Sequence, residues 1–517
     1  MAKNVVVWLR NDLRLHDNEA LTEAVAARPQ SLSVVYCLDP RHFERTAICA
    51  FPKTGAFRAR FLFQSLADLR QRLRDLGNDL LILRGLPEVE LPALIQKYQI
   101  DEIYFHQEAT TEEKSVERHL IKNLQAVDRQ TTHVHPYWGS TLFHMEDLPF
   151  EIENLPDIFT QFRVACEKNS KIRQPLISPK YLPQAPAGMV PGNLPTLAEF
   201  QLPDLEIDPR GVMNFEGGET AAIRRLDDYI WHLDRLKIYK NTRNGLLGAN
   251  YSSKFSAWLA HGCLSPKLIA AEVARYERER VQNESTYWLI FELIWRDFFR
   301  FMALKVGSSL FQRSGPRRVM KKWVLNFDQL QLWREGKTGI PFVDANMREL
   351  LLTGFQSNRG RQNVASFLVK NLGIDWRAGA EWFESQLIDY DVCANWGNWA
   401  YVAGVGNDPR QDRYFHVIKQ ARDYDPDARY VKTWLPELQS LDSDDAHEPW
   451  RLKNKRRQQM FDAFAEDLDY PEPMIDLDSS YENLRAEQSR DSDNQSRPFH
   501  HDGAKQRRHD STTNCFS

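Results

Sequence analysis

Close to its start the chain reads Val5-Val6-Val7-Trp8-Leu9-Arg10-Asn11-Asp12-Leu13. Its first five residues form the short β-branched and apolar run that is typical of a buried strand. The residues that follow do not form a G-x-G-x-x-G fingerprint. The absence of this glycine fingerprint disfavours a nicotinamide-binding Rossmann domain.

Similar short runs recur through residues 1–140 and alternate with amphipathic stretches such as Phe57–Leu76. The alternation predicts an α/β N-terminal domain with a doubly wound parallel sheet. Besides Val5–Leu9, the expected strands are Leu32–Leu38, Leu80–Leu83, Glu102–Phe105 and His133–Tyr137.

Beyond residue 140 the pattern changes twice. Residues 141–216 are expected to be a connector, and its proline-rich part, Gln174–Arg210, should cross a surface without forming helix. Residues 217–472 predict an all-α domain. Residues 473–517 are polar and are expected to form a disordered tail. The expected helices are Ala221–Lys240, Pro266–Arg280, Thr286–Lys305, Phe342–Thr353, Gln362–Leu372 and Ala378–Ile388.

Composition excludes several classes of protein. The 517 residues are 42% hydrophobic and 27% charged, as in an ordinary soluble globular protein. The formal net charge of −4 argues against a protein that coats nucleic acid through bulk positive charge. No apolar run approaches the roughly 20 residues of a membrane span, and no signal segment opens the chain. Six scattered cysteines without C-x-x-C predict a reducing, cytoplasmic location and no metal site.

The run Asp389-Tyr390-Asp391-Val392-Cys393-Ala394-Asn395-Trp396-Gly397-Asn398-Trp399 combines carboxylates, a carboxamide and indoles. Indoles are costly to expose, and carboxylates are costly to bury without partners. The run therefore predicts the lining of a pocket for a large, flat molecule with polar edges. Arg361 could pair with Asp389 or Asp391, either as a structural ion pair or beside a cofactor.

Two further segments carry polar groups. Tyr251-Ser252-Ser253-Lys254-Phe255-Ser256 precedes a helix and could cradle a phosphate, although a serine-rich N-cap is the better explanation of these residues taken alone. Glu292 and Arg296 lie one turn apart on an apolar helix. They could form an internal salt bridge, or Glu292 could face a cavity beside Trp295, where burial raises the pKa of a carboxyl group.

At these motifs the chain resembles the photolyases and cryptochromes, from about residue 4 to about residue 470. Trp8–Asn18, Gly336–Arg348 and Asp389–Trp399 carry the resemblance. Tyr137–Leu142 and Trp396–Trp399 are most similar to the DASH cryptochromes. The resemblance implies a photolyase-like fold, with noncovalent FAD in the all-α C-terminal domain.

The resemblance also implies roles for particular residues. Tyr239, Ser252, Ser253, Lys254, Phe255 and Ser256 would hold the phosphates and ribityl chain of FAD, and Arg296, Arg361, Asp389 and Asp391 would surround its ring and sugar. Asn395 would face the flavin nitrogen that is protonated on reduction and would favour the reduced form. Trp399, Trp376 and Trp323 would carry electrons to the flavin, although tryptophans at such spacings are more often core.

The implied substrate is a cyclobutane pyrimidine dimer. Glu292, Trp295 and Asn358 match residues that hold a dimer flipped out of DNA. Tyr401 and Gln362 stand where ordinary dimer photolyases have tryptophan and methionine, so single-stranded or looped DNA is the expected partner. The protein is expected to act as a monomer.

Glu108 matches the carboxylate that contacts 5,10-methenyltetrahydrofolate, an antenna chromophore, in DASH relatives; otherwise it is a surface glutamate. DNA phosphates could be bound by Arg313, Arg317, Arg318, Lys321 and Lys322, or by Arg410 and Arg413.

Three functions remain open. The first is light-driven dimer repair by a photolyase. The second is a blue-light photoreceptor that signals through flavin redox state and its tail, residues 473–517. The third is a DNA-binding protein with a vestigial flavin, which the presence of Arg361, Asp389 and Asn395 disfavours.

Overall fold

The computed structural model describes residues 3–127, 132–407, 413–452 and 469–496. It divides into two compact units, residues 1–474 and residues 475–517. None of the described helices is long and apolar enough to cross a membrane.

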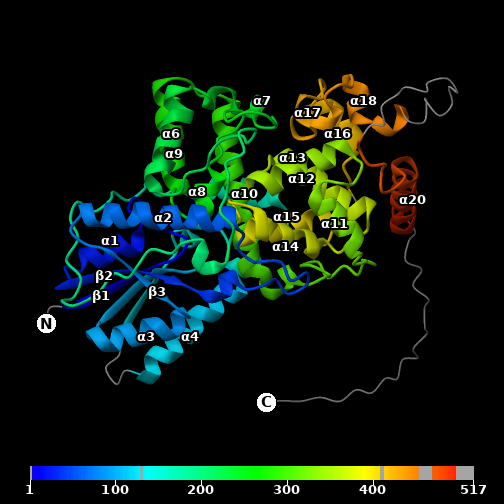
Figure 1. Cartoon of the computed structure of the whole chain (residues 1–517). Coiled ribbons are helices and arrows are strands. Elements are labelled where there is room, and N and C mark those ends of the chain that lie inside the picture. The colour runs from blue at the N-terminus through cyan, green and yellow to red at the C-terminus, as the bar shows by residue number, and fades with distance from the viewer. Residues whose placement is uncertain (1–2, 128–131, 408–412, 453–468, 497–517) are drawn as a thin grey trace, which may run out of the picture. The chain divides into compact units, whose positions relative to one another are not determined.

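The N-terminal part is a five-stranded parallel sheet in the order β3-β2-β1-β4-β5. Helices α1 (Glu19–Ala26) and α2 (Ala56–Asp75) cover one face, and α3 (Pro87–Tyr98) and α4 (Thr111–Val127) cover the other (Figure 1). The doubly wound sheet is confirmed, and every strand lies within two residues of its expected ends. The strands are β1 Asn4–Leu9, β2 Ser31–Leu38, β3 Leu80–Arg84, β4 Glu102–His106 and β5 His133–Tyr137.

The connector contains one α-helix, α5 (Phe159–Asn169), and then runs along the sheet. Its proline-rich part contains only a single 3-10 turn, Ala198–Phe200. The amide of Ile82 in edge strand β3 donates to the carbonyl of Pro191 at 2.8 Å. The connector thus covers a strand edge that would otherwise expose unpaired backbone groups.

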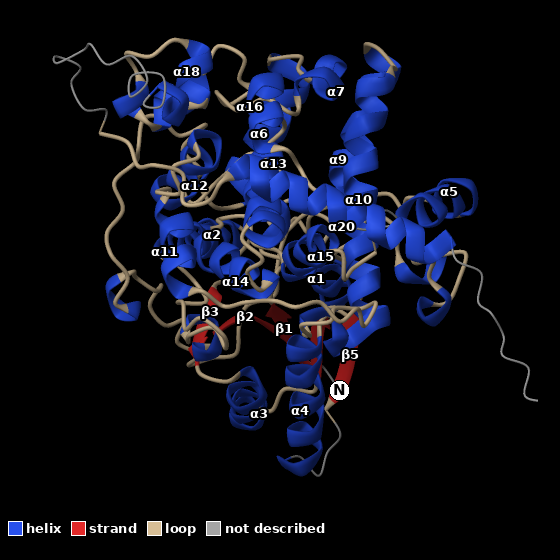
Figure 2. Cartoon of the chain, turned by 90° about the vertical axis from the view of Figure 1, so that its right-hand side faces the viewer, coloured by secondary structure: helices blue, strands red, loops and turns tan. Residues whose placement is uncertain are grey.

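Beyond the connector every regular element is helical within the described residues (Figure 2). The expected helix Ala221–Lys240 is broken, because Asp234 adopts a left-handed conformation with φ of 53°. The helices are α6 Glu219–Asp227, α7 Tyr239–Thr242, α8 Ser256–Ala260, α9 Pro266–Glu279, α10 Glu284–Val306, α11 Phe327–Glu335, α12 Pro341–Thr353, α13 Asn358–Ser366, α14 Trp376–Gln386, α15 Val392–Ala403, α16 Val417–Tyr424, α17 Arg429–Trp434 and α18 Ser443–His447.

Buried polar contacts join the sheet to the helices. Lys267 at the start of α9 pairs with Asp17 at 2.9 Å, and the Arg14 guanidinium donates to the carbonyl of Gly262 at 2.9 Å. Gly262 has a φ of +67°, and a Cβ there would lie 1.9 Å from the carbonyl oxygen of Asn11. Only glycine therefore allows the loop after β1 to approach the end of α8.

The tail differs from expectation. Helix α20 (Leu477–Ser496) lies within the segment expected to be disordered, while residues 497–517 lie outside the described part. The Asp476 carboxylate accepts a hydrogen bond from the Ser479 amide at 2.9 Å, as an N-cap does. Leucine, glutamate, alanine and arginine in the first turns then favour helix.

Candidate functional site

Helices α8, α10, α13 and α15 line a cavity of about 500 Å³. Most residues predicted to bind FAD line this cavity, although the outermost of them, Tyr239 and Asp391, lie more than 100 positions apart in the chain. The cavity is lined by Tyr239, Ser252, Ser253, Lys254, Phe255, Ser256, Arg296, Arg361, Asp389 and Asp391. Asn395 lines an adjoining cavity of about 100 Å³ that shares Arg361, Asp389 and Asp391 with the first.

The loop before α8 is held by Arg225 of α6, which the sequence did not single out. Its guanidinium donates to the carbonyl oxygens of Ser253 at 3.0 Å and Ser252 at 3.2 Å. Another hydrogen bond reaches the Asn250 side chain at 3.0 Å. Because Arg225 occupies these carbonyls, the loop is fixed with its hydroxyl side chains along the cavity. An arginine paired only with carbonyl oxygens has no local sequence signal.

Arg361 pairs with Asp389 rather than with Asp391. Its Nη2 lies 2.9 Å from Asp389 Oδ2, and its Nε donates to the carbonyl of Gln356 at 2.9 Å. Only 2% of the Asp389 side chain is exposed. The ion pair compensates the burial of this carboxylate at the cavity wall.

Several buried polar atoms of the cavity wall have no hydrogen-bond partner among the described residues. They are Tyr251 Oη, Lys254 Nζ, both side-chain polar atoms of Gln356, and Asp389 Oδ1. Burial lowers the pKa of Lys254 well below its ordinary value. Unsatisfied buried groups of both kinds, donors and acceptors, fit a bound molecule with phosphates, hydroxyls and a polar ring edge.

Asp391 joins the main cavity to a second one. Its carboxylate accepts a hydrogen bond from Arg300 and lies 3.7 Å from Arg296, and its other oxygen caps α15 by accepting from the Ala394 amide at 3.0 Å. Burial alone would raise the pKa of Asp391, but Arg300 and Arg296 lower it to about 2. Asp391 therefore stays ionised and orients the helix that carries Asn395 and Trp399.

Glu292 does not form the alternative salt bridge with Arg296. It pairs with Arg243, which follows α7, and Arg296 instead donates to the carbonyls of Ser140 and Leu259. Burial raises the pKa of Glu292, and the charge of Arg243 opposes that rise. The side chain lines the main cavity beside Trp295, as the second interpretation expected.

The other predicted substrate residues lie in the same cavity. Trp295 stacks on Phe159 with ring centroids 3.5 Å apart. The ring of Tyr401 lies edge-on to Trp295, with centroids 6.3 Å apart. Gln362 accepts a hydrogen bond from Arg359 at 3.0 Å, and Asn358 is exposed at the start of α13. Glu292, Trp295, Asn358, Gln362 and Tyr401 all line the cavity that holds the predicted flavin residues.

The three tryptophans predicted to carry electrons lie on different elements and differ in exposure. Trp399 lines the cavity of Asn395 and packs on Gly379 of α14. Trp376 is fully buried, and its indole donates to the carbonyl of Arg313 at 3.2 Å. Trp323 is partly exposed, and a parallel bridge joins the next residue, Val324, to Ile374, two residues before Trp376.

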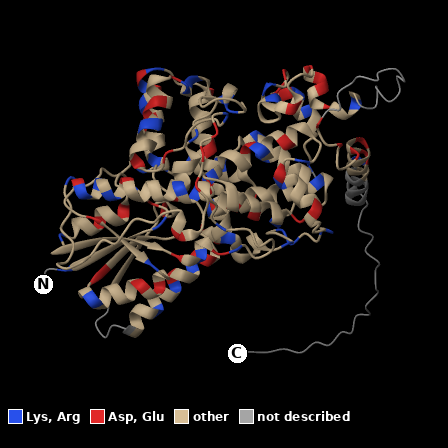
Figure 3. Ribbon diagram, viewed as in Figure 1, with Lys and Arg blue, Asp and Glu red and all other residues tan. Residues whose placement is uncertain are grey.

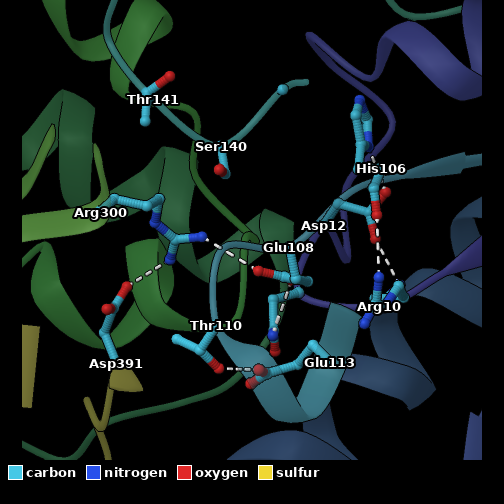
Figure 4. A network of polar contacts seen from close by, with 12 residues as sticks. Arg10, Asp12, His106, Glu108, Thr110, Glu113, Ser140, Thr141, Arg300 and Asp391 are labelled. Atoms are coloured by element: carbon cyan, nitrogen blue, oxygen red, sulfur yellow. Dashed lines mark hydrogen bonds and ion pairs between the residues drawn. The ribbon is translucent and has the colours of Figure 1, made fainter. Parts of the chain in front are cut away.

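Glu108 is buried rather than on the surface, and it lines a second cavity of about 180 Å³ between the sheet and the helices. Its carboxylate accepts hydrogen bonds from Asn11 at 3.0 Å and from Arg300 at 3.2 Å. Figure 4 shows Arg300 between Glu108 and Asp391. Arg300 thus bridges the walls of both cavities, a role that its place on an apolar helix did not indicate.

Basic and acidic residues are interspersed over the helices in the view of Figure 3. Of the candidate phosphate contacts, Arg413 lines the main cavity, and Arg313 interacts with the Trp323 carbonyl and with Asp375. Arg410 lies outside the described residues.

Comparison with known proteins identifies the family. The family model of the FAD-binding domain of DNA photolyase matches residues 288–490, and the DNA photolyase model matches residues 5–184. The cryptochrome DASH of Gloeobacter violaceus is 53% identical over 475 residues, which cover 92% of this chain and 93% of that protein. That of Synechocystis sp. is 52% identical over 482 residues, covering 93% and 97%.

Solved structures agree. The crystal structure of the Synechocystis cryptochrome superposes with a TM-score of 0.88 at 52% identity, covering 93% of this chain and 98% of that one. A bacterial class III photolyase from Agrobacterium tumefaciens gives 0.80 at 28% identity, covering 95% and 98%. The chain therefore belongs to the photolyase and cryptochrome family, is more than half identical to the two DASH cryptochromes above, and contains an FAD-binding domain in its helical part.

Proposed function

We propose that this protein is a photolyase that splits cyclobutane pyrimidine dimers in single-stranded or looped DNA under blue light. The observation that carries the proposal is that Glu292, Trp295 and Asn358 share one cavity with Arg361 and Asp389. A dimer held by the first group would lie against FAD held by the second. When bound there, FAD would supply the electron that opens the dimer and would receive it back.

The protein residues supply position and electrostatics. When it is protonated, the Glu292 carboxyl, whose pKa burial raises against the charge of Arg243, would donate a hydrogen bond to a dimer carbonyl, where negative charge develops. Trp295, braced by Phe159, would stack on the flipped bases. Asn395 donates from its amide to the Ala380 carbonyl at 3.0 Å, so its neutral side chain is held in one orientation and would face the flavin ring.

The preference for single strands follows from the stacking surface. Tyr401 meets Trp295 only edge-on, and Gln362 is engaged by Arg359. Flipping a dimer out of a duplex costs a few kcal/mol, and this cost is smallest where base pairing is already lost. A limited stacking surface is therefore best matched to unpaired DNA.

A second chromophore is part of the proposal. Glu108 and Arg300 place a carboxylate and a guanidinium in the wall of the second cavity, which fits the polar pterin ring of methenyltetrahydrofolate. A solved archaeal photolyase from Sulfolobus tokodaii, 25% identical with a TM-score of 0.74, is described as containing two FAD molecules, with the implication of a novel light-harvesting cofactor.

The test illuminates the reduced, FAD-loaded protein with an oligonucleotide that carries one thymine dimer, single-stranded in one arm and duplex in the other. Dimer loss in the single strand, faster than in the duplex, supports the proposal. Equal rates would contradict the strand preference. No loss in either arm with reduced FAD would contradict repair and would favour the photoreceptor function.

A further inference from the structure

Trp396 has no place in the series Trp399, Trp376 and Trp323, yet it touches the middle member. Its ring centroid lies 5.7 Å from that of Trp376, at an interplanar angle of 79°. Trp396 is buried on α15, and Phe311 packs against it at 5.0 Å. Electron transfer between aromatic rings weakens steeply with separation, so a ring in contact with Trp376 competes with the next member of the series.

Trp396 in turn reaches a tyrosine. Its indole nitrogen donates a hydrogen bond to the hydroxyl of Tyr390 at 3.3 Å. Because Tyr390 accepts from Trp396, its own hydroxyl proton is directed elsewhere. Trp376, Trp396 and Tyr390 therefore form a continuous aromatic path that leaves the series at its middle.

Tyr390 lies at the second cavity with charged groups around it. Arg58 sits over its ring at 4.5 Å, and Glu384 of α14 lines the same cavity. Burial raises the pKa of Tyr390 well above its ordinary value, with Glu384 and Glu113 adding to the rise and Arg58 opposing it. Its phenol is thus neutral and can lose an electron only together with its proton.

Glu384 supplies a base for that proton. Glu384 lines the same cavity as Tyr390, and burial raises the pKa of its carboxyl group to about 7, against the charges of Arg58 and Lys53. A carboxyl group with such a pKa is substantially ionised at neutral pH and can accept a proton from a neighbouring hydroxyl.

We propose that Trp396 and Tyr390 form a second branch of the electron-transfer chain, with Glu384 as proton acceptor. This branch rests on the proposed series, in which photoexcited oxidised FAD draws an electron through Trp399 from Trp376. The Trp376 cation radical takes an electron from Trp396, and the Trp396 cation radical takes one from Tyr390. The hydroxyl proton of Tyr390 moves to the Glu384 carboxylate, which leaves a neutral tyrosyl radical. A small thiolate in solution returns the electron, and Glu384 returns the proton.

The test uses the FAD-loaded, oxidised full-length chain in which Trp323→Phe closes the outer end of the series. Transient electron paramagnetic resonance after a blue flash should show a tyrosyl radical. That signal should be lost in Trp323→Phe/Tyr390→Phe and in Trp323→Phe/Trp396→Phe. Glu384→Gln on the same background should slow its appearance, and FAD absorbance confirms that each variant is loaded.

Tyr104→Phe is the matched control, because the Tyr104 hydroxyl donates to the Glu102 carboxylate at 2.6 Å but lies in the sheet. It should leave the signal unchanged. A tyrosyl signal that survives Tyr390→Phe, or a radical confined to tryptophan in Trp323→Phe, would overturn the branch. Trp399→Phe separates the two proposals: radical formation that survives it would overturn the series itself, whereas its loss shows that the series operates.

Discussion

Arg361 Nη2 lies 2.9 Å from Asp389 Oδ2, while Asp389 Oδ1 has no hydrogen-bond partner among the described residues. The protein therefore satisfies one of the two carboxylate oxygens, and Asp389 lines the cavity that we assign to FAD. The pair is at once a structural ion pair and a part of the binding site.

Arg361→Ala should lower both stability and flavin content. Removing one partner of a buried ion pair leaves the other charge uncompensated and lowers the free energy of unfolding by about 3 kcal/mol. Urea unfolding and the ratio of FAD to protein absorbance measure the two effects. Arg275→Ala is the control, because its pair with Glu279 is exposed to solvent and should contribute little to stability. Equal effects of both substitutions would contradict the assignment.

Binding of dimer-containing DNA should depend on the protonation of Glu292. Its pKa lies above the ordinary value of 4.5 because the group is buried. The neutral donor form predominates below that pKa, so affinity should fall as the pH rises through it. Glu292→Gln, a permanent donor, should bind with little pH dependence, and Glu292→Ala should bind weakly throughout. Fluorescence titrations with a dimer oligonucleotide check this, and a Gln variant that keeps the pH dependence would refute it.

His261 should make the fold sensitive to acid. Burial lowers its pKa from 6.5 to about 4, and Arg58 adds to the shift, so the unfolded chain is protonated first as the pH falls. Stability is fully present above pH 6.5 and declines toward pH 4, by about 3 kcal/mol. Unfolding free energies at several pH values should show this loss reduced in His261→Gln. His232→Gln, at an exposed position, should leave it in place.

Glu108→Gln should reduce occupancy of the second chromophore without removing FAD. Glu108 accepts from Asn11 and Arg300 at the second cavity, whereas the main cavity is lined by other residues. The near-ultraviolet absorption of the pterin should fall while the flavin bands remain. Glu112→Gln, an exposed residue of the same cavity, is the control. Loss of both chromophores from Glu108→Gln would show a structural role instead.

Asn395→Asp should destabilise reduced FAD. A carboxylate in this buried position would repel the negative charge of the reduced ring, and each 1.4 kcal/mol of repulsion lowers a one-electron potential by about 59 mV. Spectroelectrochemical titration measures the shift. Asn398→Asp, exposed on the same helix, should shift the potential less. An unchanged potential in Asn395→Asp would contradict the role of Asn395.

The sequence by itself determined the sheet and most of the helices. Runs such as Val5–Leu9 and His133–Tyr137 have strand periodicity that local sterics and burial impose, and their observed ends agree to within a residue. The Asp389–Trp399 run likewise indicated a pocket, because its residue types have few other stable environments. The prediction of one continuous helix over Ala221–Lys240 was wrong, because Asp234 adopts a left-handed conformation that the spacing of apolar residues does not encode.

Only the tertiary structure decided which charges meet. Glu292 pairs with Arg243 rather than with Arg296 one turn away, Glu108 is buried against Arg300, and Arg225 holds the loop before α8. These partners lie between 28 and 192 positions apart in the chain. The physical reason is that periodicity reports which face of an element is buried, whereas a side-chain ion pair depends on how distant elements pack. The sequence therefore indicated which residues line the cavity, whereas the packing of distant elements determined which ion pairs and hydrogen bonds they form.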